Sequence, residues 1–163
     1  MADTTRLDRE LADALGLAQS VRATALSAGE HIDPDSKLAR RLSVVDDDLA
    51  QMQERANEVV VASPRKRAVL TARARRLRDA QSAAGRDRPS DADALDTLQA
   101  LVAETAYAVA QWVVVRRLAK AYGAEDIRRL AKWAHPLAER HLELALEGVD
   151  KVAKRQAAAL KGE

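Results

Sequence analysis

Apolar residues recur along this chain at steps of three and four, the spacing of one face of an α-helix. The longest such stretch runs from Ser90 to Gly123, and its seam residues are Leu95, Leu98, Val102, Thr105, Val109, Trp112, Arg116 and Ala119. Ser90 and Asp93 fit a capping box at its start, and Gly123 fits a left-handed cap at its end. Further apolar residues widen the stripe: Leu101, Ala108, Val113 and Val115. We therefore expect this helix to be buried on more than one side.

Three more stretches show the same spacing. The first opens with Thr5 and Asp8 as a capping box, and its seam residues are Leu7, Leu11, Ala14, Ala18, Val21 and Ala25. The second has Leu38, Leu42, Val45, Leu49, Met52, Ala56 and Val59. The last has Ile127, Leu130, Ala134, Leu137, His141, Leu144 and Gly148, with Pro136 inside the pattern. Pro136 lacks a backbone donor, so we expect a kink near Lys132.

The stretch between Pro64 and Ser90 is too long for a hairpin loop and carries a short helical pattern of its own. A crossover there makes the second and third long helices parallel, as in ferritin-like bundles. The sequence thus predicts one all-α domain over residues 1–163, a ferritin-like four-helix bundle whose long crossover between the second and third long helices carries a short helix. The predicted helices are at about residues 5–28, 35–62, 65–84, 91–122 and 124–155.

Composition supports this fold class and narrows the chemistry. Apolar residues make up 47% of the 163 residues, yet aromatic residues are only 2% and Phe is absent. The chain has no Cys, which excludes disulfides, thiolate catalysis and cysteine-bound metal sites. Its polar, acidic start is unlike a secretory signal, and the longest apolar run, Ala106 to Val115, is about half a bilayer span. We expect a cytoplasmic protein that does not enter a membrane.

A helical bundle invites a search for a carboxylate-bridged di-metal centre, which needs Glu-x-x-His pairs pointing inward. This chain has none: the residues three before its histidines His31, His135 and His141 are Ala28, Lys132 and Ala138. We therefore expect no cofactor and no di-metal site.

His141 nevertheless lies on the inward seam of the last helix. We favour a core histidine that is hydrogen-bonded to Thr105 or to a carboxylate. The alternative is a metal ligand of a reduced site, with Glu104, Glu139 or Asp48 as its companions. His135 and Glu139, one turn apart, are a second weak metal candidate and more often form a helix surface pair. The run Asp46-Asp47-Asp48 is interpreted as a solvated face.

Positive charge gathers in the crossover. Residues 65–88 hold nine Lys and Arg against Asp79 and Asp87, whereas residues 1–64 hold seven basic and twelve acidic residues. The candidates for phosphate or nucleic-acid binding are Arg65, Lys66, Arg67, Arg75, Arg76 and Arg78. We favour the alternative, in which the segment pairs with the acidic first half of the bundle or with a second subunit.

Arg73 is the residue that we expect to pair with the acidic first half of the bundle. It shares one helical face with Val69 and Leu77, so we expect it to face the bundle while Arg75 and Arg78 point away. An inward charge needs a partner, and the acidic candidates on the first two helices are Asp13, Asp46, Asp48 and Glu54.

The segments PRKRAVLTA, RRLAKAYG and AEDIRRLA, within residues 7–153, resemble ferritin-like domains of the YciF type, which are bacterial stress-associated proteins. The resemblance implies a ferritin-like fold and a dimer. In that family, metal ligands stand where this chain has Val45, Thr105, Ala108 and Ala138, which leaves His141 as the one remaining ligand position.

These observations predict a non-enzymatic, metal-free bundle that acts as a structural or protein-interaction module and forms a homodimer. Two alternatives stay open. One is an atypical metal site near His141, and the other is nucleic-acid or polyphosphate binding by residues 65–88.

Overall fold

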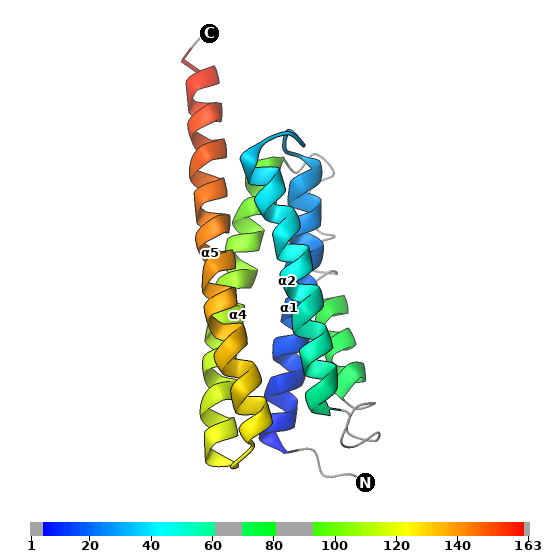
Figure 1. Ribbon diagram of the computed structural model, residues 1–163. Coiled ribbons are helices and arrows are strands. Elements are labelled where there is room, and N and C mark those ends of the chain that lie inside the picture. The colour runs from blue at the N-terminus through cyan, green and yellow to red at the C-terminus, as the bar shows by residue number, and fades with distance from the viewer. Residues whose placement is uncertain (1–4, 61–69, 81–92, 162–163) are drawn as a thin grey trace.

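The computed structural model describes residues 5–60, 70–80 and 93–161, and within these ranges all secondary-structure elements are helices. The four long helices are α1 (Arg6–Glu30), α2 (Lys37–Val60), α4 (Ala94–Ala121) and α5 (Glu125–Ala159). Residues 70–80 form a further helical segment in the stretch between α2 and α4. The all-α fold class expected from the sequence is confirmed (Figure 1).

The long helices pack side by side so that neighbours are antiparallel: α1 with α2, α1 with α4, α4 with α5, and α2 with α5. A Cβ atom added to Gly148 on α5 would lie 3.0 Å from a methyl group of Leu98 and 3.5 Å from one of Leu38. The first turns of α2 and α4 therefore lie at the same end of the molecule. These two helices run in the same direction, as the length of the stretch that joins them predicts (Figure 1).

Local hydrogen bonds explain where the helices begin and end. The Thr5 hydroxyl accepts from the Asp8 amide and the Asp8 carboxylate accepts from the Thr5 amide at 2.9 Å, which is the predicted capping box. Gly123 takes the left-handed conformation, with φ of 67°, directly after α4. The cap of α4, however, is Asp93, whose carboxylate accepts from the amides of Leu95 and Asp96. Ser90, the predicted cap, lies outside the described residues.

α5 is longer than the sequence pattern suggested. It continues to Ala159 rather than ending near residue 155, and it passes through Pro136 without a break in its helical assignment. Figure 1 shows its last turns extending beyond the ends of the other three long helices. The predicted kink near Lys132 stays a prediction, because an unbroken run of helical residues does not exclude a bend.

The core is built from the predicted seams. All six seam residues of α1 are buried, and so are six of the seven on α2 and on α5. Trp112 on α4 is the largest fully buried side chain, at 1% exposure. The interior also holds many alanines, which let the helices approach closely, such as Ala131, Ala134 and Ala145 on α5.

Residues 70–80 pack against α1. A Cβ atom on Gly16 of α1 would lie 2.7 Å from the carbonyl oxygen of Ala74, so only glycine fits at this contact. Leu70 and Ala74 are buried. The predicted short helix spanned 65–84; its portions 65–69 and 81–84 lie outside the described residues.

The two apolar helices α1 and α4 differ in how much of their surface is covered. α1 contacts α2, α4 and residues 70–80, whereas α4 contacts α1 and α5. The expectation that α4 is buried on more than one side is confirmed, because α1 and α5 both pack against it and Leu101, Ala108 and Val115 are buried. A further face of α4 stays exposed, and its residues are Ala103, Ala106, Tyr107, Ala110 and Val114.

α4 is also the one described helix that is long and apolar enough, by length and composition, to cross a membrane. Core helices of soluble proteins meet the same criterion, and this property alone assigns no location.

Candidate functional site

His141 lies on the inward face of α5 and is 5% exposed. Its Nε2 atom is 3.0 Å from the Oδ2 atom of Asp48 on α2. A carboxylate only accepts hydrogen bonds, so Nε2 of the neutral imidazole carries the hydrogen atom and donates a hydrogen bond to Asp48. The favoured sequence interpretation, a core histidine bonded to a carboxylate, is confirmed, with Asp48 rather than Thr105 as the partner.

Thr105 instead bonds within its own helix. Its hydroxyl donates to the carbonyl oxygen of Leu101 at 2.7 Å, and it also lies 3.1 Å from that of Val102. Such back-bonding satisfies a buried hydroxyl without a partner from another helix.

The bundle geometry places three of these positions at one level. Gly148 on α5 lies level with Leu98 on α4 and Leu38 on α2, and both helices run antiparallel to α5. Seven residues are about two helical turns, so His141 comes level with Thr105 and Val45. Val45 is 2% exposed and Thr105 is 1% exposed. The mid-level interior thus offers a histidine, a hydroxyl that is already bonded, and an aliphatic side chain.

Burial determines the protonation of His141. Desolvation lowers its pKa below the ordinary histidine value of 6.5, and this outweighs the hydrogen bond and the charge of Asp48, which raise the pKa. Arg140 next to it also lowers the pKa. His141 is therefore neutral at pH 7, with Nε2 engaged by Asp48.

The other metal-ligand candidates do not join His141. Glu139 is exposed, and the His135 Nδ1 atom lies 3.7 Å from its Oε2 atom as a pair along one helix. Glu104 is two turns before Gln111, whose amide bonds to Glu10 of α1, so Glu104 lies on the α1 side of α4. Across residues 5–60, 70–80 and 93–161, no three His, Asp or Glu side chains group closely enough to hold a metal ion.

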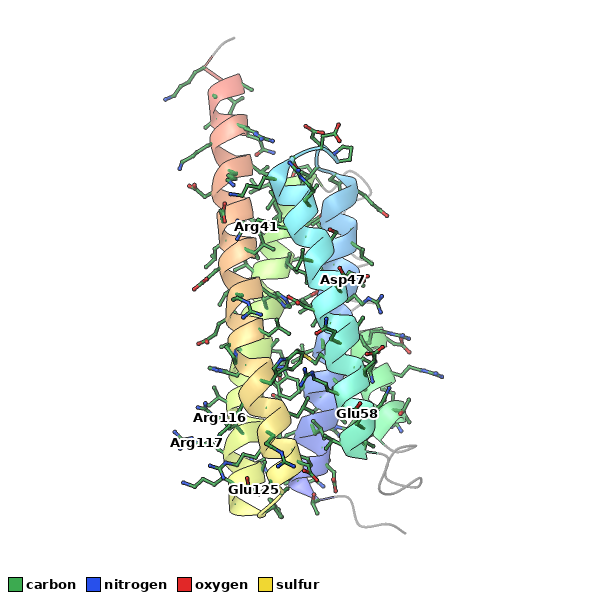
Figure 2. The ribbon with its side chains drawn as sticks, in the orientation of Figure 1. Arg41, Asp47, Glu58, Arg116, Arg117 and Glu125 are labelled. Carbon is green, nitrogen blue, oxygen red and sulfur yellow. The ribbon has the colours of Figure 1, made fainter. Side chains whose placement is uncertain are left out.

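The acidic run on α2 is only partly the solvated face that was expected. Asp47 is exposed (Figure 2), but Asp46 pairs with Arg22 of α1 and Asp48 turns toward α5. The Arg22 guanidinium holds the pKa of Asp46 below its usual value. The run therefore links α2 to both of its neighbours.

One residue of the basic segment, Arg73, pairs with the acidic first half of the chain as the structural interpretation predicted. Arg73 donates two hydrogen bonds, from Nε and Nη2, to the carboxylate of Asp13 on α1, each 2.7 Å long. The pair raises the pKa of Arg73. Its side chain is nevertheless 44% exposed, so it lies along the surface of α1 and not in the core.

The other candidate phosphate-binding residues of this segment differ in their surroundings. Arg78 bonds to Asp79 and lines a depression beside Gln19 and Arg22 of α1, so the expectation that it points away from the bundle was wrong. Arg75 and Arg76 are exposed, as predicted for Arg75. Arg65, Lys66 and Arg67 lie outside the described residues.

Two contacts between α2 and α5 were missed by the sequence reasoning. Arg41 of α2, which is labelled in Figure 2, pairs with Glu147 of α5, and Lys151 bonds to the same carboxylate at 2.6 Å. The two cations lower the pKa of Glu147 to about 2. Nearer the other end, the Arg55 guanidinium lies 4.4 Å from the ring centre of Trp133. An i,i+4 spacing signals Lys151, but no local pattern signals a partner on another helix.

The Arg55–Trp133 contact borders an open depression of about 430 Å³ between α2 and α5. Glu58 and Asp126 stand in it beside Arg55 and Arg129, so its charges balance. It presents neither a strong field nor a buried polar group that could orient a substrate.

Comparisons with family models, with curated proteins and with solved structures find no match to this chain. The interior and the surfaces described above therefore carry the functional argument by themselves.

Proposed function

We propose that this protein is a metal-free, ferritin-like helical bundle that acts as a structural or protein-interaction module, without enzymatic activity, and that its partner is a second copy of the chain. The observation that carries this proposal is the composition of the mid-level interior. Val45, Thr105, Ala108 and Ala138 are all buried there, and among the described residues the carboxylate that bonds to His141 is Asp48.

The ferritin-like assignment is supported by topology. The parallel course of α2 and α4, joined by a long crossover, is the connection that distinguishes ferritin-like bundles from simple up-down bundles. A di-metal centre in that architecture requires a Glu-x-x-His pair from each of two helices and a Glu from each of the other two. Ala138 and Thr105 stand where such carboxylates are expected from the family resemblance.

Metal analysis of protein purified without a histidine tag tests the proposal. We expect far less than one equivalent of iron, manganese or zinc per chain, both as purified and after incubation with each metal and desalting. About one or two equivalents, lost in His141→Ala, would overturn it. Glu139→Ala is the matched control, because Glu139 is exposed on the same helix.

A gain-of-ligand variant tests the ferritin-like geometry separately. Ala138→Glu creates a Glu-x-x-His pair with His141, and Thr105→Glu adds a carboxylate at the level of His141. Buried carboxylates destabilise the fold unless a cation pairs with them. We expect the double variant to melt earlier than the parent and to recover when Co²⁺ or Zn²⁺ is added. A melting temperature that no metal changes would contradict the proposed geometry, while leaving the metal-free proposal intact.

A further inference from the structure

The outward face of α4 is apolar in its middle and charged at its ends. Its exposed residues follow the helical spacing for six turns: Asp96, Gln99, Ala103, Ala106, Tyr107, Ala110, Val114 and Arg117. The Tyr107 side chain is 52% exposed and Val114 is 36% exposed. Figure 2 shows Arg117 extending outward from the part of α4 that approaches Glu125. An apolar strip that is framed by opposite charges is typical of a protein contact surface.

This face is self-complementary about its midpoint, which falls between Ala106 and Tyr107. Residues that are equally far from the midpoint are Ala103 and Ala110, Gln99 and Val114, and Asp96 and Arg117. A two-fold axis through that point places a second α4 antiparallel to the first. Each Asp96 then meets the Arg117 of the other copy, at both ends of a contact about 32 Å long. A parallel arrangement would instead place Arg117 beside Arg117.

The side chains suit this contact in size as well as in charge. Ala103, Ala106 and Ala110 allow two helix axes to come close, because the interaxial distance depends on the side chains at the contact. Tyr107 then covers the Ala106 of the other copy, which supplies the large apolar area that alanines lack. Asp96 and Arg117 are both exposed within one chain, so neither has to leave a buried site to make the pair.

We propose that the chain forms a two-fold homodimer through the outward face of α4, with the two α4 helices antiparallel and Asp96 paired with Arg117 across both ends. This inference rests on the proposed interaction function and names its surface and orientation. It commits to a second copy because the charges of the face are complementary to the same face turned by 180°.

The first test places a charge at the centre of the contact. In sedimentation equilibrium at micromolar concentrations, we expect the parent to have twice the mass of one chain and Ala106→Glu to have the mass of one chain. Ala72→Glu is the matched control: Ala72 is an exposed helical alanine on the segment that covers α1, and its variant should stay dimeric. Circular dichroism should show that both variants are as helical as the parent.

The second test reads the orientation. Asp96→Arg and Arg117→Asp should each raise the dimer dissociation constant about tenfold or more, because like charges then meet at both ends. The double variant restores opposite charges across the axis and should return to within about threefold of the parent, although every charge is reversed. Arg76→Asp, on an exposed site elsewhere, should leave the constant unchanged.

Three results would overturn this inference. A parent that is monomeric throughout the concentration range has no such contact. A dimer that persists in Ala106→Glu uses another face, which leaves the proposed interaction function standing. A monomer that binds vesicles of phosphatidylcholine and phosphatidylglycerol, and loses that binding in Ala106→Glu, uses the face for a membrane instead. Metal analysis, which tests the metal-free part of the proposed function, depends on none of these outcomes.

Discussion

α1 and α4 each contact two long neighbours, as every long helix of the bundle does, and they differ in what covers their remaining surface. On α1 the helical segment 70–80 fits against Gly16 and is tied down by the Arg73–Asp13 pair. On α4 the corresponding surface is an exposed strip that includes Tyr107 and Val114. The segment 70–80 thus covers α1 within the chain and leaves the outward face of α4 exposed.

This comparison is the reason for locating the proposed interaction on the surface of α4 and not in the interior. At the middle level of the interior, His141 pairs with Asp48, and that pair is satisfied within the fold. A buried polar pair that satisfies itself contributes to stability and helps to fix which helices are neighbours. The outward face of α4 is different, because its apolar residues gain stability only when something covers them.

The largest expected effect comes from forcing the covering segment away from α1. Gly16→Val adds side-chain atoms where even a Cβ would lie 2.7 Å from the Ala74 backbone oxygen and 3.0 Å from the Leu77 Cβ. We expect the free energy of unfolding to fall by about 1–3 kcal/mol, the usual cost of overpacking. Urea denaturation followed by circular dichroism measures this change.

Gly29→Val is the control, because a Cβ at Gly29 of α1 meets no atom within 4 Å. Its stability should stay within about 0.5 kcal/mol of the parent. Hydrogen exchange should also accelerate in residues 70–80 of Gly16→Val before it does in α4 or α5. Equal stability of the two valine variants would contradict the close contact between α1 and the segment.

A second effect comes from the pH dependence of the buried histidine. Because the pKa of His141 in the folded state lies below 6.5, the unfolded chain binds its proton first as the pH falls. Stability should therefore be constant for this group above pH 6.5 and decrease as the pH falls below it. Each unit of pKa difference is equivalent to about 1.4 kcal/mol.

Urea melts of the parent and of His141→Gln between pH 7.5 and pH 5 measure this effect. The relevant acidic range lies below the ordinary histidine pKa of about 6.5 and is about one and a half pH units wide. We expect the parent to lose more stability over that range than the variant, which keeps a donor near Asp48 but has no titrating group. His31→Gln, at an exposed position, should behave as the parent. A parent that becomes more stable on acidification would mean that Asp48, not burial, controls the histidine.

The smallest effect concerns the ion pair that fastens the segment. Arg73→Ala removes both hydrogen bonds to Asp13, but the arginine side chain is 44% exposed and water screens the pair. We expect a loss of about 0.2–1 kcal/mol, less than for a buried pair. Arg75→Ala should remain within about 0.5 kcal/mol of the parent. Denaturant melts measure the free energy of unfolding of the parent and of both variants. Equal values for all three proteins would show that the Arg73–Asp13 pair does not anchor the segment.

Much of the fold follows from local patterns in the sequence. The seams of α1, α2 and α5 predicted the core because the 3.6-residue period fixes which side chains share a face. The capping box at Thr5 and the left-handed Gly123 follow from backbone groups that need partners at helix ends. The sequence alone did not decide whether Ser90 or Asp93 caps α4, since serine and aspartate are both common cap residues and these two lie only three residues apart.

The placement of side chains between helices was harder to predict. Asp48 is adjacent to the seam residue Leu49, and periodicity alone does not determine whether it faces solvent or His141 on α5. The inward direction of Arg73 was predictable from its helical face, but its partial exposure depends on how deeply the segment sits on α1. The sequence showed that α4 has apolar residues on more than one face, but no local pattern specifies which long helix the segment 70–80 covers.

The central claim, that two copies meet through antiparallel α4 helices, has one direct test. The chain has no cysteine, so single cysteines report one contact each. Ala103→Cys chains mixed with Ala110→Cys chains, one of them carrying a size tag, are allowed to exchange and are then oxidised. Directly opposed residues can form a disulfide, whereas identical residues lie about 10 Å apart along the axis in the antiparallel pair.

We expect the mixed disulfide, which joins an Ala103→Cys chain to an Ala110→Cys chain, to form first and to exceed both disulfides between identical chains. A predominance of the disulfides between identical chains would indicate parallel helices. A yield no greater than that of an Ala72→Cys control, on the far segment, would show that the face of α4 is not the contact. Either result would contradict the account.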